Sequence, residues 1–334
     1  MGVRRRHAAA ALAIVLVVIL AAAAGASLWL RARYQAPGPS ASAVTVVVPP
    51  GTSTKAIGRR LAKAGVLTSP SLFAAEAELS RGGRLKAGEY AFPAGASIGT
   101  VLEMMRRGQV VVHKFTVAEG LTVAQALALL ERAPALNGAV DARPSEGSLL
   151  PETYHYLWGE TREALIARMA RAMRELLADL WAARVPGLPL TDPEQALILA
   201  SIVERETAVP AERAHVAAVF ENRLRRHMRL QSDPTVIYAL SKGAGVLDRA
   251  LTRGDLAVAS PYNTYAVEGL PPGPICNPGR ASLAAVLHPA ASDDLYFVAD
   301  GGGGHVFART LADHERNVRH WRAEEREREK GGAP

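Results

Sequence analysis

Two carboxylates, Glu204 and Glu206, stand at the end of a segment that is otherwise almost entirely apolar. The segment Ala196–Val203 is apolar nearly all round, which is typical of a helix buried in a core. On a helix, Glu206 shares a stripe with Leu199 and Ile202, whereas Glu204 lies on the opposite side. A carboxyl in this position is a candidate general acid, because apolar surroundings and the negative end of the helix dipole disfavour its charged form. The alternative is a structural glutamate with a basic partner.

The residues on either side of this segment indicate where the helix begins and ends. Asp192 is a suitable N-cap, Pro193 fits the first helical position, and Gln195 completes a capping pattern. Pro210 predicts that the helix ends shortly after the two glutamates. The sequence therefore predicts one buried helix within Thr191–Pro210 that carries a glutamate at its carboxyl end.

Further polar groups follow in two segments. Gln231 precedes a Ser-Asp-Pro sequence that predicts a short helix to about Leu240. We expect Asp233 to cap this helix, and a catalytic carboxylate is the second interpretation of the same residue. Ser260–Gly279 is a long proline-rich loop, and long loops in compact domains are usually functional. Aromatic faces beside amide and hydroxyl groups suit sugar rings. This loop offers such groups at Tyr262, Asn263 and Tyr265.

A third candidate segment is Ser145–Trp158, which is rich in turn-forming and aromatic residues. Its Glu146 could face a ligand, although a packed loop explains the composition equally well. Farther along, Glu163–Arg184 has the pattern of a long amphipathic helix, and Leu295–Val298 with His305–Ala308 predicts a hairpin across a glycine turn.

The composition indicates a globular protein and limits the classes of partner that it can bind. The chain has 334 residues, of which 49% are hydrophobic and 21% charged, with a net charge of +7. A basic surface suits nucleic acid, anionic lipid or a polyanionic cell wall, but without zinc-finger or RRM-type motifs nucleic acid is disfavoured. The single cysteine, Cys276, excludes an intrachain disulfide. No metal, phosphate-loop or serine-hydrolase motif is present, so we expect no metal and no cofactor.

The N-terminus resembles a membrane anchor. The run Ala8–Leu30 carries no charge and is long enough to span a bilayer. The basic residues before it favour a cytoplasmic N-terminus with the remainder outside. A cleaved signal peptide is the rival interpretation, since Ala24-Gly-Ala26 is a plausible cleavage site. We expect a cytoplasmic tail over 1–7, an anchor over 8–30 and a linker over 31–43.

A weak internal repeat organises the chain after the linker. The motifs Gly51-x-Ser53, Gly95-x-Ser97 and Gly120-x-Thr122 each follow a β-prone segment and precede apolar residues four apart. This pattern predicts a strand, a glycine turn and a helix capped by the hydroxyl residue. The first two copies predict a small α+β module over 44–112. The third opens a mixed α+β domain over 113–325, followed by a tail over 326–334.

Several of these segments together resemble the membrane-anchored endolytic murein transglycosylases, the MltG or YceG-like family. The matching segments are Ala200–Ala208, Met228–Tyr238, Tyr262–Tyr265, Gly269–Gly279 and the hairpin within Leu295–Phe307. The resemblance implies a LysM-like module over 44–112 and a transglycosylase catalytic domain over 113–325. It also implies that Glu206 is the catalytic residue.

The resemblance implies cleavage between N-acetylmuramic acid and N-acetylglucosamine that leaves 1,6-anhydromuramic ends. Binding of the sugar is expected from six side chains: Gln231, Asp233, Tyr262, Asn263, Tyr265 and Glu146. Expected partners are peptidoglycan glycan strands, the cytoplasmic membrane and, as a hypothesis, a peptidoglycan synthase, with the C-terminal domain facing the periplasm or wall.

Two other classes of function remain open. The protein could be a hydrolase in which Asp233 or Glu204 activates water, because ordinary glycoside hydrolysis uses two carboxylates. It could also be a wall-binding scaffold without activity. Only the position of Glu206 and the family motifs favour the transglycosylase.

Overall fold

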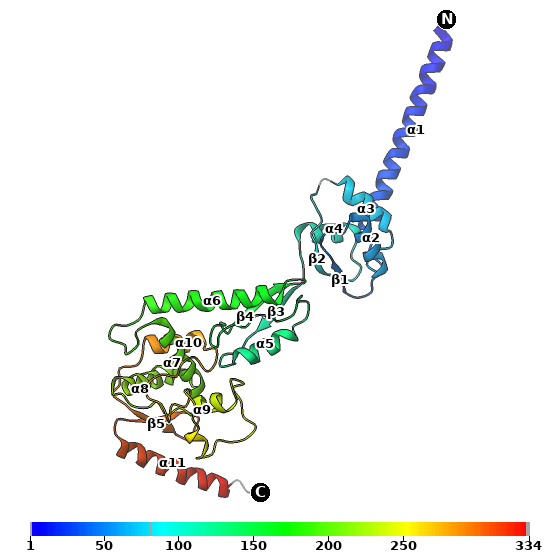
Figure 1. Cartoon of the computed structure of the whole chain (residues 1–334). Coiled ribbons are helices and arrows are strands. Elements are labelled where there is room, and N and C mark those ends of the chain that lie inside the picture. Colours follow the sequence, from blue (N-terminus) through cyan, green and yellow to red (C-terminus); the bar gives the residue numbers. More distant parts are fainter. Residues whose placement is uncertain (1, 81, 332–334) are drawn as a thin grey trace. The chain divides into compact units, whose positions relative to one another are not determined.

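The computed structural model describes residues 2–80 and 82–331 (Figure 1). It is a mixed α+β structure that divides into two compact units. The first runs up to His113 and includes Leu157–Gly159, and the second holds Lys114–Tyr156 and the chain from Glu160 onward.

The first unit begins with a long apolar helix, α1 (Gly2–Gln35). Within its part Ala10–Gln35, an 18-residue window has a mean hydropathy of 2.7, and none of that window is buried against the rest of the protein. In length and composition this is a helix that can cross a bilayer, as expected from the sequence. Helix α1 is therefore a candidate membrane anchor.

A small module follows α1. It contains β1 (Val44–Val48), α2 (Thr54–Lys63), α3 (Pro70–Leu79), β2 (Gly88–Phe92) and α4 (Ile98–Arg107). The two strands pair antiparallel, and side chains from the strands and all three helices form one buried core. Helix α3 is the one element of the module that the repeat did not predict, and it falls between the two copies.

The predicted strand–turn–helix units are confirmed. Gly51, Gly95 and Gly120 all have positive φ, at 79°, 63° and 78°, where an L side chain would be strained. The hydroxyl residues Ser53, Ser97 and Thr122 each accept a hydrogen bond from the backbone N–H three residues on. They cap α2, α4 and α5 (Val123–Glu131).

The strands β3 (Val112–Thr116) and β4 (Thr153–Leu157) form a two-stranded sheet, and most of their residues belong to the second unit. Strand β4 lies in the segment that the sequence indicated only as turn-rich. Its pairing partner is far away in the chain, so local residue preferences did not reveal it.

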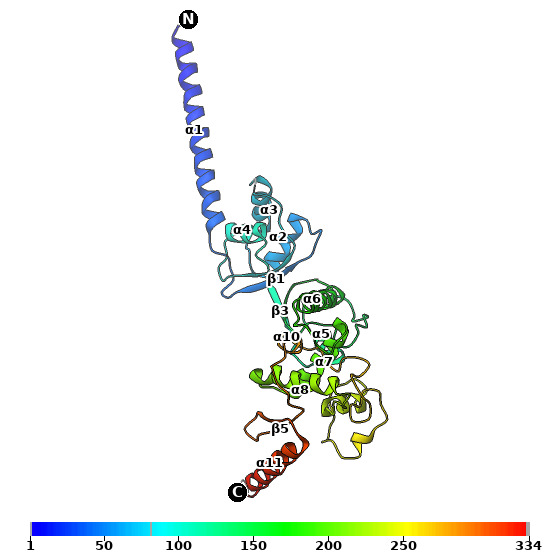
Figure 2. The ribbon, with the colours of Figure 1, turned by 90° about the vertical axis from the view of Figure 1, so that its left-hand side faces the viewer.

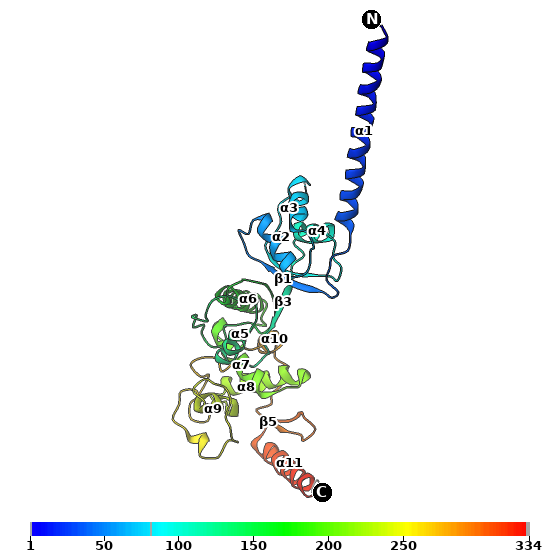
Figure 3. The same cartoon turned by 90° about the vertical axis from the view of Figure 1, so that its right-hand side faces the viewer.

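Helix α7 (Pro193–Glu206) is the buried helix of this unit. It contacts α6 (Arg162–Ala182), α8 (Arg213–Arg225), α9 (Asp233–Leu240) and α10 (Arg280–Leu287), as Figures 2 and 3 show from two sides. The short 3₁₀ helices η1 (Pro210–Glu212) and η2 (Asp255–Ala257) lie in the connections. The predicted hairpin is confirmed as β5 (Tyr296–Ala299) and β6 (His305–Ala308), and α11 (Leu311–Gly331) packs on it.

The predicted ends of α7 are also confirmed. Asp192 accepts a hydrogen bond from the N–H of Gln195 at 2.9 Å. The Gln195 side chain reaches back to the N–H of Thr191 at 3.0 Å, one residue earlier than in the usual capping box. The helix ends at Glu206, so its last turn delivers this glutamate from a rigid, buried element.

Candidate active site

The carboxyl of Glu206 is held by the hydroxyl of Ser232, which donates a hydrogen bond to Oε1. Burial raises the pKa of Glu206 to about 7. The Ser232 hydrogen bond opposes this rise in pKa, the negative charge of Asp233 adds to it, and the positive charges of His305 and Arg223 oppose it. Near neutral pH, both the acid and the carboxylate forms of Glu206 are therefore populated.

Ser232 is itself fixed by a buried cluster of hydroxyls. Its N–H donates to Thr264 Oγ1 at 2.9 Å, and its carbonyl accepts from Thr235 Oγ1 at 2.7 Å. The hydroxyls of Thr235 and Thr264 lie 2.9 Å apart. All three residues are at most 1% exposed. The proline-rich loop, through Thr264, thus sets the position of the group that touches Glu206.

A buried guanidinium lies on another side of the site. Arg223 is 8% exposed, and its Nε donates to the carbonyl of Leu295 at 2.7 Å. Its Nη1 donates to the carbonyl of Leu230 at 2.8 Å and to Oε1 of Gln231 at 3.3 Å. Gln231 has φ of 53°, and this strained backbone is stabilised by a hydrogen bond from its N–H to a loop carbonyl.

Asp233 and Tyr265 form a pair beside the same carboxyl. The Tyr265 hydroxyl donates to Asp233 Oδ1 at 2.6 Å. Burial and the charge of Asp233 raise the pKa of Tyr265. The prediction that Asp233 caps the helix is wrong by one residue, because the N-cap of α9 is Ser232. The Ser232 side chain donates to Glu206 instead of capping the helix backbone, and Asp233 is exposed.

Glu204 has different surroundings, as the helical positions predicted. Its side chain is 5% exposed and accepts a hydrogen bond from the N–H of Gly279 at 2.8 Å. Its other oxygen pairs with Arg213 at 3.5 Å. The two glutamates thus have different surroundings. Glu204 holds the far end of the proline-rich loop, whereas Glu206 accepts from the Ser232 hydroxyl and has charged side chains of both signs nearby.

A second pair of acidic and basic groups supports the end of α7. Glu212 accepts hydrogen bonds from the His305 ring at 2.7 Å and from the His305 N–H at 2.9 Å. Burial alone would raise the pKa of Glu212, but the bonds from His305 outweigh it, so the pKa lies below its usual range. Thr207, directly after Glu206, donates to the same carboxylate at 3.4 Å.

The remaining predicted residues fall into two places. Glu146 accepts from the N–H of Val123 at 2.8 Å and from the hydroxyl of Tyr238 at 3.3 Å, and burial raises its pKa. Tyr238 packs on Tyr262, with ring centroids 4.9 Å apart. Asn263 is fully buried. Its amide donates to the carbonyls of Leu256 and Val258, just before the loop, and accepts from the N–H of Tyr265 within it.

The structure therefore brings Gln231, Asp233 and Tyr265 to the surroundings of Glu206. It places Glu146 and Tyr262 together in a neighbouring cluster joined through α9. Three residues of the site were not predicted from the sequence to belong to it: Ser232, Arg223 and His305. Ser232 lies inside the Ser-Asp-Pro sequence noted above, whereas nothing in the sequence links Arg223, on α8, to Glu206. Within residues 2–80 and 82–331, no group of three or more histidine, cysteine or acidic side chains is arranged to hold a metal.

Replacing Ser232 with alanine is expected to raise the pKa of Glu206. The Ser232 hydroxyl stabilises the charged carboxylate, so its loss favours the protonated form, by about one pH unit for a hydrogen bond of ordinary strength. Titration of the carbon-13-labelled glutamate carboxyls by NMR, with Glu206→Gln to assign the signal, measures this. Thr116→Ala, which removes a distant exposed hydroxyl, is the control. A Glu206 pKa unchanged or lowered in Ser232→Ala would contradict the role of Ser232.

Comparison with known proteins places the chain in a family. The model of the YceG-like family matches residues 46–320. An endolytic murein transglycosylase of Bacillus subtilis (strain 168) is 31% identical over 305 residues, which cover 82% of this chain and 83% of that protein. One of Streptococcus pneumoniae (strain ATCC BAA-255 / R6) is 32% identical over 320 residues, covering 82% of this chain and 58% of the longer relative.

A solved structure agrees with these matches. The crystal structure of a yceG-like protein from Listeria monocytogenes is 30% identical, with a TM-score of 0.51, and covers 82% of this chain and 98% of that one. The fold and the site thus define a mixed α+β protein in which a buried helix ends on Glu206, a glutamate of raised pKa. The chain belongs to the YceG-like family.

Proposed function

We propose that this protein is an endolytic murein transglycosylase, a lyase that cleaves peptidoglycan glycan strands internally. The bond cleaved is the β-1,4 link from N-acetylmuramic acid to N-acetylglucosamine. The relatives with that name support the proposal. The observation that carries it is Glu206, whose pKa of about 7 lets one carboxyl act as an acid and then as a base.

In the first step, protonated Glu206 donates its proton to the glycosidic oxygen. The bond between that oxygen and C1 of the muramic acid breaks, and an oxocarbenium-like charge develops at C1. The N-acetylglucosamine side leaves as an alcohol. Glu206 is now a carboxylate, and the positive charges of Arg223 and His305 favour this form.

In the second step, the Glu206 carboxylate takes the proton of the C6 hydroxyl of the same muramic acid. The C6 oxygen forms a bond to C1, which closes a 1,6-anhydro ring. One C–O bond is broken and one is formed, the proton returns to Glu206, and no water is consumed. Because the substrate supplies its own nucleophile, the scheme needs no second catalytic carboxylate.

The six predicted binding residues have two proposed roles. Gln231, Asp233 and Tyr265 are exposed or partly exposed beside Glu206, and we assign them direct contact with the sugar. Glu146, Tyr262 and Asn263 hold the surrounding segments through the contacts described above, so they orient the glycan strand indirectly or at its next sugar unit.

The N-terminal part is proposed to hold the enzyme at the wall side of the cytoplasmic membrane. Helix α1 would place its N-terminus in the cytoplasm and the catalytic domain, 113–325, outside. The order β1, α2, α3, β2 supports a LysM-like module over 44–112 that binds glycan. Release of nascent strands near the membrane would bring the protein close to a peptidoglycan synthase.

The ends of the reaction products test this function. Full-length protein in detergent is incubated with purified peptidoglycan, and the fragments are analysed by mass spectrometry. The expected products are internal fragments that carry 1,6-anhydromuramic ends. Reducing muramic ends would instead show a hydrolase, and binding without any cleavage would show a wall-binding scaffold.

A further inference from the structure

The connection between α1 and the module is packed against the module. Tyr34 packs against the module core, and the N–H of Gly38 donates to the carbonyl of Gly95 at 3.1 Å. The N–H of Gly95 in turn donates to the carbonyl of Ser40 at 2.8 Å. A Cβ at Gly38 would lie 2.5 Å from two carbonyl oxygens, so only glycine fits there. The last turns of α1 are therefore fixed against the module.

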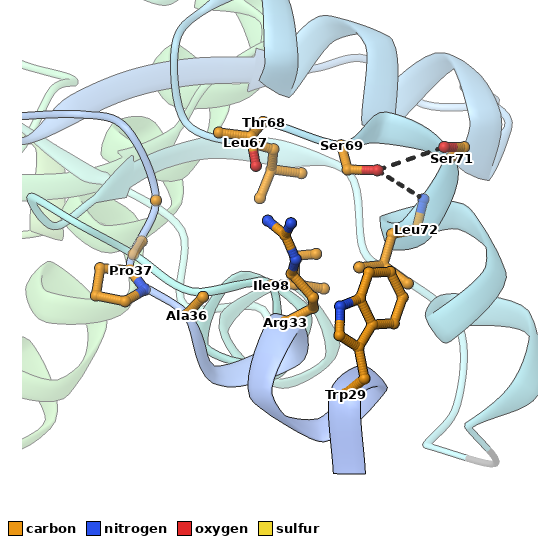
Figure 4. Close-up of a pocket in the computed structure, with 12 residues that line it drawn as sticks. Trp29, Arg33, Ala36, Pro37, Leu67, Thr68, Ser69, Ser71, Leu72 and Ile98 are labelled. Carbon is orange, nitrogen blue, oxygen red and sulfur yellow. Dashed lines mark hydrogen bonds between the residues drawn. The ribbon is translucent and has the colours of Figure 1, made fainter. Parts of the chain in front are cut away.

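This junction lines an open cavity of about 650 Å³. Figure 4 shows the guanidinium of Arg33 pointing into it and the indole of Trp29 at its side, both from α1. The opposite wall comes from the start of α3, where Thr68, Ser69 and Ser71 carry hydroxyls. The Ser69 hydroxyl accepts from the N–H of Leu72 at 3.3 Å and lies 3.4 Å from the Ser71 hydroxyl (Figure 4).

The chemistry of the cavity suits an anion that carries an apolar tail. Among the residues that the structure describes, no carboxylate lines it, and its charged lining group is Arg33, which lies over the Trp29 ring at 5.5 Å. The guanidinium fork and the hydroxyls are donors suited to phosphate oxygens. The N-terminus of α3, which Ser69 caps, carries a partial positive charge, which has the same sign as the charge of Arg33 and also favours an anion. Leu67, Leu72 and Ile98 supply apolar walls.

The position of the cavity indicates the source of this anion. Trp29 and Arg33 stand at the carboxyl end of the apolar stretch of α1. Tryptophan and arginine occupy this position in membrane helices because the headgroup region meets water there. With α1 in a bilayer, this cavity would therefore lie at the level of the lipid headgroups.

We propose that this cavity binds the phosphate headgroup of an anionic membrane phospholipid. Arg33 pairs with the phosphate, the hydroxyls of Thr68 and Ser71 complete its hydrogen bonds, and Trp29 packs beside the upper acyl chain. The lipid fixes the module against the membrane surface. This inference rests on α1 lying in the bilayer and is independent of the cleavage chemistry.

Native mass spectrometry of the full-length protein in detergent, titrated with phosphatidylglycerol, tests the proposal. Arg33→Gln is expected to weaken binding of the first lipid about fivefold to tenfold. Arg31→Gln is the matched control, since it removes the same charge from α1 outside the cavity, and is expected to change binding less than twofold. Equal losses in both variants would show only general attraction to anionic lipid and would overturn the proposal.

A second pair of variants leaves α1 intact. Thr68→Glu places a carboxylate opposite Arg33 and is expected to abolish binding of the first phosphatidylglycerol, whereas Thr68→Gln retains it. Phosphatidylcholine and inorganic phosphate are the ligand controls. Competition by inorganic phosphate at the same concentration as the lipid would show that the cavity binds a free anion. Equal binding of phosphatidylcholine would show that the cavity does not recognise the negative charge of the lipid. Either result would refute the lipid site.

Discussion

Glu206→Gln is expected to lower the rate of strand cleavage by at least about a thousandfold, because this one side chain serves as both the acid and the base of the reaction. Glutamine keeps the size of the side chain and can still accept a hydrogen bond from Ser232. It has no proton to give at the first step and no negative charge to receive one at the second. Fragment release from peptidoglycan, followed by mass spectrometry under single-turnover conditions, measures the effect.

Glu204→Gln is the matched control, because it makes the same change on the same helix two residues away. The amide oxygen can still accept from the N–H of Gly279, whereas the amide NH2 that then faces Arg213 cannot accept, so this ion pair is lost. We expect activity to remain within about tenfold of the parent, as for loss of one partly buried ion pair. If Glu204→Gln were the inactive variant and Glu206→Gln retained activity, the catalytic assignment would move to Glu204.

Arg223→Met is expected to lower the free energy of unfolding by about 3 to 4 kcal/mol. Methionine fills similar volume but leaves the buried carbonyls of Leu230 and Leu295 without donors. The change also removes a positive charge that favours the ionised form of Glu206, so the pKa of Glu206 should rise above about 7. Urea unfolding measures the first effect, and the pH dependence of cleavage measures the second.

For this variant the control is Arg226→Met, which removes an exposed arginine directly after α8. Its stability should stay within about 0.5 kcal/mol of the parent, as for most surface substitutions. A similar loss in both variants would mean that net charge, not the buried hydrogen bonds, explains the result. An unshifted pH profile in Arg223→Met would separate the arginine from the chemistry of Glu206.

The elements that local sequence determines were predicted well. The caps Asp192, Ser53, Ser97 and Thr122 were correct because an N-cap depends on one side chain and the backbone three residues on. The orientation of Glu204 and Glu206 toward different surroundings was correct for a similar reason, since helical periodicity fixes it. The burial of α7 was predictable because its apolar residues occupy every side.

The contacts that join distant segments were not predictable. The cap of α9 was assigned to Asp233, since nothing nearby shows that the Ser232 hydroxyl is taken by Glu206. Strand β4 was missed because its partner β3 lies far away in the sequence. Helix α3 was missed for a local reason, because its apolar residues give little contrast between its faces. The other two errors concern residues whose partners come from elsewhere in the chain.

The hydroxyl cluster of Ser232, Thr235 and Thr264 couples the position of the proline-rich loop to the protonation of Glu206. Any movement of the loop that draws Ser232 away from Glu206 removes the bond that stabilises the carboxylate, so the protein takes up protons as the loop moves. By thermodynamic linkage the reverse also holds, and acidification shifts the loop toward its displaced position. A glycan that displaces this loop as it binds would thereby favour the protonated form of Glu206, which is the form that donates the proton in the first step.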